Sequence, residues 1–253
     1  MFRKLDWIVV PGGPGLSAKY LKWGLSEPFK EYKLHFYNPL GAPDADEDRI
    51  PKVNELVEQI FEVAKQKELK SFGLITHSFG NYLAMRALQK KQNKISSIIM
   101  ISPMPFVYSK WKNGLAQIAK SIPKNVLEKI QQLAKKQNNG AEIFKVFFPY
   151  YASKTAALPD IPFSLKTCDA ISAQVDEYDD TELLKSCKLP WVCIIGDKDP
   201  LFVEKKLLQN DTIVVFGTGH YPFFEDPKKF NDAVKKVEEK LCQKQITVTQ
   251  NSF

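Results

Sequence analysis

Short apolar runs alternate along the chain with longer stretches in which apolar residues recur at helical spacing. The short runs predict buried strands at residues 7–10, 32–37, 72–75, 95–102, 191–196 and 212–216. Helical spacing predicts helices at about 17–30, 51–68, 82–88, 201–208 and 226–243. Strands that alternate with helices favour an α/β fold, in which a mostly parallel sheet is covered by helices on both faces.

The alternation stops between residues 106 and 189, where helical patterns and many aromatic residues replace the strand patterns. We expect this segment to be a helical cap inserted over the carboxyl edge of the sheet, where ligands bind in open α/β sheets. Most of its aromatic side chains are expected to pack the cap onto the core. The predicted organisation is a core of residues 1–105 and 190–245, a cap of residues 106–189, and a polar tail of residues 246–253.

Composition and charge narrow the classes of partner. In a chain of 253 residues, 44% apolar residues allow a substantial core. The formal charge of +7 would suit an anionic partner, but the lysines are scattered over predicted helix faces. They form no basic stripe interleaved with aromatic residues, and the chain carries no nucleic-acid motif. We therefore expect no nucleic-acid partner.

The cysteines and the lengths of the apolar runs indicate in which compartment of the cell the protein is expected. The four cysteines form no C-x-x-C pair and show no metal-ligand spacing with the three histidines, so no metal is expected. Cys193 falls within an apolar strand, where a reduced and buried thiol is usual. The apolar runs are too short to span a bilayer, and residues 7–10 are too short for a signal-peptide core. These features favour a cytoplasmic protein without a membrane span.

A serine stands where one predicted strand turns directly into a helix. Ser78 follows the apolar run 72–75, and helical spacing begins within a few residues after it. A serine at such a corner has its hydroxyl pushed out of the sheet edge, beside backbone N–H groups of the following helix. A serine two residues before a glycine is also common in proteins that do not use it for catalysis.

A serine hydroxyl is a poor nucleophile unless a base removes its proton and an acid orients that base. His35 lies within a predicted strand, and His77 shares the turn with Ser78, so we expect its ring to point away and to pack or lie at the surface. His220 follows the final strand in a glycine-flanked loop, from which it can reach the serine. Two acids, Asp197 and Asp199, follow the preceding strand.

A glycine-rich loop, residues 11–15, follows the first strand. It matches neither common phosphate-binding pattern. It can be a plain turn, or it can be an oxyanion loop, in which glycines allow a backbone N–H to approach a substrate carbonyl.

Taken together, these segments resemble the α/β-hydrolase family over nearly the full length of the chain. The loop Pro-Gly-Gly-Pro-Gly is similar to the H-G-G-P-G loop of the proline iminopeptidase-like branch, with Pro11 in place of the histidine. Thr76 stands where G-x-S-x-G has its first glycine. Residues 196–199 match a G-x-x-D pattern, and residues 219–227 look like the G-H-x-P…E-x-P segment around the family's base.

The resemblance implies roles for particular residues. Ser78, Asp199 and His220 would form a catalytic triad, in which Asp199 rather than Asp197 is the acid. The N–H groups of Gly13 and Phe79 would form the oxyanion hole. No cofactor is required. Only about six residues precede Trp7, so we expect the strand hairpin that usually comes before the oxyanion loop to be missing. Candidate substrate-binding aromatic residues are Trp111, Phe147, Phe148, Tyr151 and Tyr221.

The function expected from this pattern is hydrolysis of an ester, an amide or a short peptide through an acyl-enzyme. The acidic cap residues allow an aminopeptidase, if one carboxylate binds a substrate amine, and a carboxylesterase fits equally well; these acids are Asp169, Asp176, Glu177, Asp179 and Asp180. Two alternatives are a non-catalytic protein that encloses a small ligand and a lyase or C–C hydrolase that uses the same triad.

Overall fold

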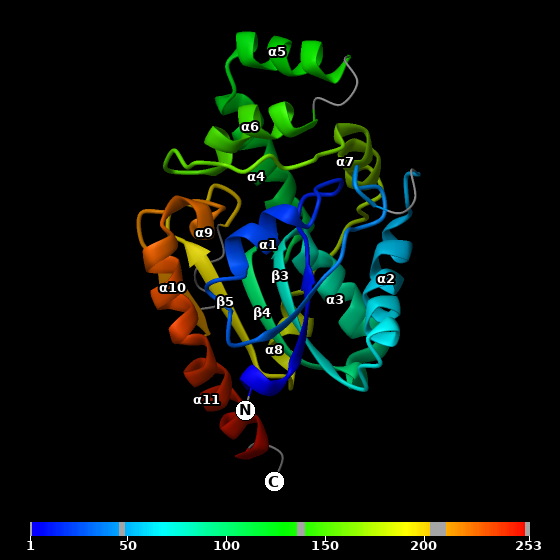
Figure 1. The fold of residues 1–253 in the computed structure, drawn as a ribbon, viewed down its shortest axis with the longest axis vertical. Helices are drawn as coiled ribbons and strands as arrows, with labels where there is room; N and C mark the ends of the chain where they lie inside the picture. Colours follow the sequence, from blue (N-terminus) through cyan, green and yellow to red (C-terminus); the bar gives the residue numbers. More distant parts are fainter. Residues whose placement is uncertain (1, 46–48, 136–139, 203–210, 251–253) are drawn as a thin grey trace.

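The computed structural model describes residues 2–45, 49–135, 140–202 and 211–250. Within these residues, six parallel strands form one sheet in the order β2-β1-β3-β4-β5-β6 (Figure 1). The strands are β1 (Asp6–Val10), β2 (Lys33–Phe36), β3 (Phe72–Ser78), β4 (Ile95–Pro103), β5 (Trp191–Gly196) and β6 (Thr212–Val215). β1 is the first strand of the described chain, and no strand hairpin precedes it there. The strand patterns in the sequence therefore predict the sheet correctly.

Alternate residues along each central strand enter two separate cores, one on each face of the sheet. In β1, Ile8 and Val10 belong to one buried cluster, whereas Trp7 and Val9 belong to the other. Because side chains alternate along a strand, a parallel sheet covered on both faces needs apolar residues at nearly every position. All six residues of β5 are buried for this reason.

Helices cover both faces of the sheet (Figure 1). Residues of α2 (Val53–Gln66) and α3 (Phe79–Lys91) contribute to the first cluster, together with Leu184 of α8 (Thr181–Ser186). Residues of α1, α9, α10 and α11 contribute to the second cluster; these helices are Lys19–Leu25, Pro222–Glu225, Pro227–Lys235 and Val237–Gln250. Two short 3₁₀ turns complete the core, at Phe2–Lys4 and Gln92–Lys94.

A helical insert follows β4 and lies over the carboxyl edge of the sheet, at the top of Figure 1. It contains α4 (Tyr108–Ser121), α5 (Lys124–Ala134), α6 (Gly140–Tyr151) and α7 (Leu165–Ser172), and it ends with α8. The first four of these helices lie above the sheet, whereas α8 packs along it. The loops that follow β1, β3, β5 and β6 therefore open towards the insert.

Two of the predicted helices differ from the structure. Helix α1 ends at Leu25 rather than near Lys30, because Pro28 has no N–H to continue the hydrogen-bond ladder. The predicted helix at 226–243 is two helices, which meet at Lys236, where the backbone N–H bonds to Ala233 O three residues back. Helix α11 continues to Gln250, into the segment expected to be a polar tail. The helix predicted at 201–208 falls almost entirely on residues 203–210, which lie outside the described residues.

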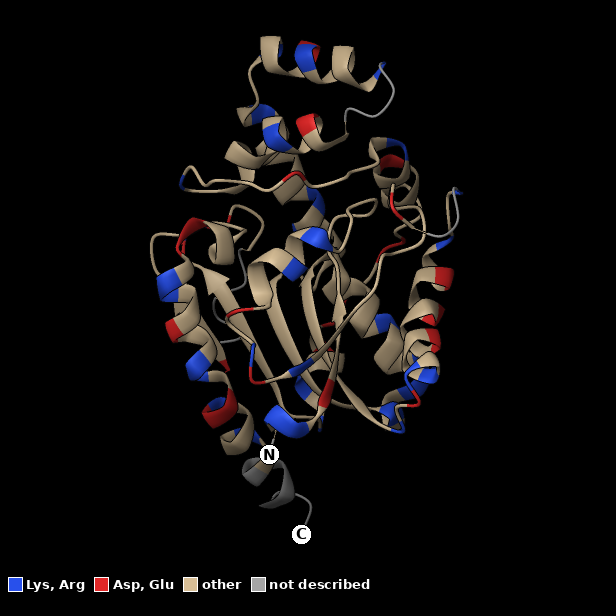
Figure 2. Cartoon of the chain, viewed as in Figure 1, with Lys and Arg blue, Asp and Glu red and all other residues tan. Residues whose placement is uncertain are grey.

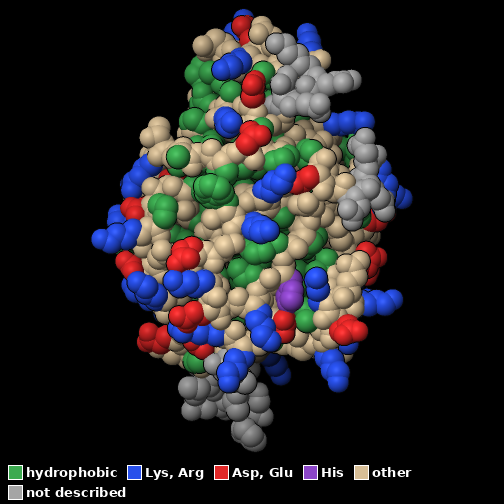
Figure 3. Space-filling model, viewed as in Figure 1, with side chains coloured by type: hydrophobic (Ala, Val, Ile, Leu, Met, Phe, Trp, Pro, Cys, Tyr) green, Lys and Arg blue, Asp and Glu red, His purple; other side chains and the backbone are tan. Residues whose placement is uncertain are grey.

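Charged side chains are distributed over the outer helices, while the strands carry few of them (Figure 2). On the face shown in Figure 3, lysines and arginines are spread around the outline and interspersed with acids, so they form no basic stripe. In the described part of the chain, no helix has both the length and the apolar character needed to cross a membrane.

Candidate active site

Ser78 occupies the sharp turn between β3 and α3, where its backbone has φ 52° and ψ −121°. A positive φ is unfavourable for a residue with a Cβ, so the surrounding structure must hold this conformation. Met104 N donates a hydrogen bond to Ser78 O at 3.1 Å. A Cβ on Gly80 would lie 2.4 Å from Val10 O, so glycine is required there for the helix to approach β1. The turn is thus fixed from both sides.

A buried acid–imidazole pair lies at the ends of β5 and β6. His220 Nδ1 is 2.9 Å from Asp199 Oδ2, and the two residues are 1% and 7% exposed. Leu201 N donates to the other carboxylate oxygen at 3.0 Å. Asp197 does not contact the imidazole, because its carboxylate accepts a hydrogen bond from Gly217 N instead. Since Nδ1 is occupied by the carboxylate, Nε2 is the nitrogen left for proton transfer.

The glycine-rich loop after β1 packs directly on the Ser78 turn. Val10 pairs with Thr76 in the sheet, so the chain leaving β1 passes beside the end of β3. A Cβ on Gly12 would lie 2.4 Å from His77 O and 2.7 Å from Ser78 Cβ. Gly13 follows with φ 49°, a conformation that glycine adopts without strain. This arrangement brings the backbone of the glycine-rich loop next to the serine.

His77 is buried in a chain of hydrogen bonds that connects the glycine-rich loop, the Ser78 turn and the backbone carbonyl of His220. Gly12 N donates to the Tyr20 hydroxyl oxygen at 2.7 Å, and Tyr20 Oη lies 2.9 Å from His77 Nδ1. His77 Nε2 lies 3.0 Å from His220 O. A carbonyl only accepts, so Nε2 carries the proton and Tyr20 donates to Nδ1. Burial, together with the nearby His220, holds the pKa of His77 well below its usual 6.5.

The sequence-based expectation for His77 was therefore incomplete. Its ring packs against aromatic neighbours, as expected, but it is 1% exposed and hydrogen-bonded at both nitrogens rather than lying at the surface. A polar ring in an otherwise apolar strand was the available signal, because a buried polar group needs partners. The partners themselves, Tyr20 and the backbone of His220, could not be identified from spacing.

The neutral state of His77 predicts a pH dependence of stability. In the unfolded chain a histidine takes up a proton below about pH 6.5, whereas the folded protein excludes it. This contribution to stability is present above pH 6.5 and is lost as the pH falls below it, by up to about 1.4 kcal/mol per pH unit. We expect denaturant unfolding between pH 6.5 and 5 to show a shallower slope for His77→Gln than for the wild type.

Tyr20→Phe serves as the control for that measurement, because it removes the two hydrogen bonds that the Tyr20 hydroxyl makes with Gly12 N and His77 Nδ1 but keeps the buried histidine. It should be less stable than the wild type and retain its pH slope. Equal slopes in the wild type and His77→Gln would contradict the interpretation.

Ser78, His220, Gly13 and Phe79 line one cavity of about 220 Å³ beneath the insert. The five aromatic residues predicted to bind substrate line the same cavity, and whether they contact substrate remains a prediction; they are Trp111, Phe147, Phe148, Tyr151 and Tyr221. Leu115, Phe144, Phe163, Cys168 and Leu201 also line it and were not selected from the sequence. Burial raises the pKa of the Cys168 thiol to about 11, which keeps it protonated.

Only one of the five acidic residues considered in the sequence lines this cavity. Asp169 on α7 does so, and partial burial raises the pKa of its carboxyl group. Asp180 is buried away from the cavity and forms an ion pair with Arg86. Asp179 accepts hydrogen bonds from Thr181. Among the described residues, the cavity is thus lined mainly by apolar side chains, and Asp169 contributes its only carboxylate.

Comparisons with known proteins agree with this architecture. A proline iminopeptidase from Heyndrickxia coagulans is 22% identical over 251 residues, which cover 88% of this chain and 86% of that protein. The crystal structure of a proline iminopeptidase-related protein from Thermus thermophilus has a TM-score of 0.69 and 19% identity, covering 96% and 92% of the two chains. A thermophilic esterase from Thermogutta terrifontis has a TM-score of 0.64 at 14% identity, covering 94% and 90%.

These low identities show a shared fold rather than a shared substrate. A model of the alpha/beta hydrolase family matches residues 8–233, which include the Ser78 turn, the insert and the Asp199–His220 pair. The chain belongs to the alpha/beta hydrolase family.

Proposed function

We propose that this protein is a serine hydrolase that cleaves an ester or amide bond of a small substrate through an acyl-enzyme. The observation that carries the proposal is that Ser78, on its strained turn, lines the same cavity as His220, whose Nδ1 is held by Asp199. A serine hydroxyl, an imidazole and a carboxylate are the groups that can act as nucleophile, base and orienting acid.

In the proposed reaction, Ser78 Oγ attacks the substrate carbonyl while His220 Nε2 takes the hydroxyl proton. The developing oxyanion is bound by the N–H groups of Gly13 and Phe79. His220 then protonates the leaving alcohol or amine, and a water molecule deprotonated by the same imidazole releases the acyl group. Asp199 keeps the imidazole in the required tautomer and stabilises its positive charge.

The cavity favours a small substrate and disfavours an anionic one. Its volume of about 220 Å³ lies below the range of roughly 300–1,000 Å³ that is usual for drug-sized ligands. Although the sequence contains 36 lysines and arginines, none of those in the described residues lines the cavity. An anionic substrate group would therefore be desolvated there without a cation, which is unfavourable.

The proposal is tested by labelling the folded protein with a fluorophosphonate and by measuring hydrolysis of short aryl esters. We expect a single adduct on the peptide that contains Ser78, and turnover of neutral esters well above that of esters bearing a terminal carboxylate. Ser172→Ala is the matched control. Ser172 lines the same cavity but is not expected to react, so this variant should be labelled at Ser78 as the wild type is. A folded protein that neither reacts nor turns over any ester would favour the non-catalytic binding alternative.

A second candidate, aminopeptidase activity, is favoured by Asp169, the carboxylate on α7 that faces the cavity. A substrate ammonium beside it would form a charge-assisted hydrogen bond worth about 1.5–3 kcal/mol. The likeness to proline iminopeptidases supports the same candidate.

Asp169→Asn tests this candidate with an N-terminal prolyl amide and its amine-blocked form. If the carboxylate binds the amine, the ratio of kcat/KM for the free over the blocked substrate should fall by about 10- to 150-fold. Asp176→Asn, at an exposed position outside the cavity lining, is the control and should keep the ratio. A wild-type enzyme that is indifferent to blocking the amine would exclude the aminopeptidase.

A further inference from the structure

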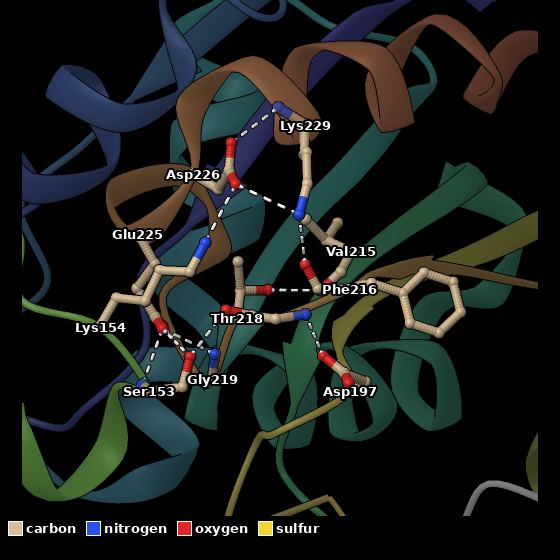
Figure 4. A network of polar contacts seen from close by, with 11 residues as sticks. Ser153, Lys154, Asp197, Val215, Phe216, Thr218, Gly219, Glu225, Asp226 and Lys229 are labelled. Carbon is tan, nitrogen blue, oxygen red and sulfur yellow. Dashed lines mark hydrogen bonds and ion pairs between the residues drawn. The ribbon is translucent and has the colours of Figure 1, made fainter.

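A second buried carboxylate lies close to His220 without touching its ring. Glu225, in α9, is 8% exposed and accepts four hydrogen bonds. Its Oε2 accepts from Gly219 N at 2.7 Å, from Ser153 N at 2.7 Å and from Ser153 Oγ at 2.9 Å (Figure 4). Its Oε1 accepts from Tyr221 N at 3.0 Å. Glu225 therefore holds the backbone on both sides of His220.

Two of those four hydrogen bonds come from the insert. Ser153 follows α6, in a short segment of residues 151–154 that we call the strap. The strap makes further contacts with the loop that carries the imidazole: His220 N donates to Tyr151 O at 2.9 Å, and Ser153 Oγ is 2.9 Å from Gly217 O. A Cβ on Gly219 would lie 2.5 Å from Tyr151 O, so the strap and the loop are in direct backbone contact.

Helix α6 reaches the cavity as well as the strap. Phe144, Phe147, Phe148 and Tyr151, all on this helix, line the cavity next to Ser78 and His220. A substrate group that packs against these rings therefore contacts the same helix whose end is tied to the His220 loop. Displacement of α6 would be transmitted through Ser153 to Glu225, and from there to the residues flanking the imidazole.

We propose that Glu225 is a positioning residue that couples the insert to His220, so that a substrate group filling the aromatic cavity fixes the base for proton transfer. The proposal rests on the serine-hydrolase function proposed above for its effect on turnover. The physical connection between strap, Glu225 and the His220 loop does not depend on that function, so it can be measured separately.

Glu225→Gln tests the connection at constant side-chain size. Both carboxylate oxygens accept from N–H groups, but a glutamine has only one oxygen, so its NH₂ group must face an N–H donor in either orientation. Peptides covering residues 217–221 and the strap should both exchange amide hydrogens faster in Glu225→Gln than in the wild type. If the strap keeps its protection while the loop loses it, the two are not coupled and the proposal is wrong.

The expected kinetic consequence is a loss of kcat that is larger for esters with a longer acyl chain. With an aryl hexanoate, which can fill the cavity, Glu225→Gln should lower kcat by about 10- to 100-fold with little change in KM, because misplacing a catalytic group has effects of that size. With the acetate ester, which leaves the rings uncovered, the loss should be several times smaller. A purely structural role would reduce the active fraction and lower kcat equally for both esters.

Substitutions in the strap provide matched comparisons. Ser153→Ala removes only the hydroxyl and should give a smaller, acyl-length-dependent loss of about fivefold, whereas Ser153→Thr keeps the hydroxyl and should restore kcat. Outside the strap, Lys145→Ala, which removes an exposed ion pair between α6 and Asp160, should stay within about twofold of the wild type.

The outcomes separate this inference from the proposed function. Ester turnover with equal losses on both esters leaves the hydrolase function intact and overturns the coupling. Absence of turnover and labelling in the wild type overturns the hydrolase function. Amide hydrogen exchange in residues 217–221 and in the strap, compared between the wild type and Glu225→Gln, still decides the coupling.

Discussion

Ser78→Ala is expected to lower kcat for ester hydrolysis by about a millionfold, to the level left by binding and the oxyanion hole. The substitution removes the only atom that can form the acyl-enzyme in the proposed reaction. Alanine keeps a Cβ, so the strained backbone at φ 52° is unchanged and the fold should be retained. Stopped assays with an aryl ester, together with circular dichroism and thermal unfolding, would measure both properties.

Ser172→Ala, made in the same cavity, should retain turnover. If Ser78→Ala kept more than about one per cent of the wild-type kcat, another nucleophile would have to be sought. The fluorophosphonate adduct would then identify it, since the reagent marks the reactive hydroxyl directly.

Asp199→Asn is expected to lower kcat by about ten-thousandfold, the size of effect seen when a triad acid is replaced by its amide. The amide NH₂ group at this position would donate to His220 Nδ1, which then gives up its proton and shifts it to Nε2. The imidazole could no longer accept the Ser78 proton.

Asp197→Asn distinguishes the two acids that follow β5. Asp197 accepts a hydrogen bond from Gly217 N, and asparagine can still accept through its side-chain oxygen, so turnover should be largely kept. A larger loss in Asp197→Asn than in Asp199→Asn would reverse the assignment. Steady-state kinetics of both variants on one neutral ester are sufficient for this comparison.

The sequence predicted the sheet because the relevant information is local. Buried parallel strands are apolar on both faces. The six short apolar runs that form the strands are therefore easy to distinguish from the amphipathic helices between them. The same local pattern placed Ser78 at a strand-to-helix corner and His220 after the last strand. Helix ends were less accurate, because the ends of α1 and α10 depend on single residues and on packing rather than on periodicity.

By itself, then, the sequence determined the fold class and which reactive side chains lie at the carboxyl edge of the sheet. The family resemblance had already favoured Asp199 over Asp197, and the structure places Asp199 at the imidazole. The tertiary structure alone decided that Asp169 is the one acidic residue of those first considered that reaches the cavity, and that His77 lies between Tyr20 and His220. It also joined Ser153 to Glu225, 72 residues apart. Hydrogen bonds over such separations depend on how the loops and the insert fold back over the sheet, and no spacing along the chain encodes that.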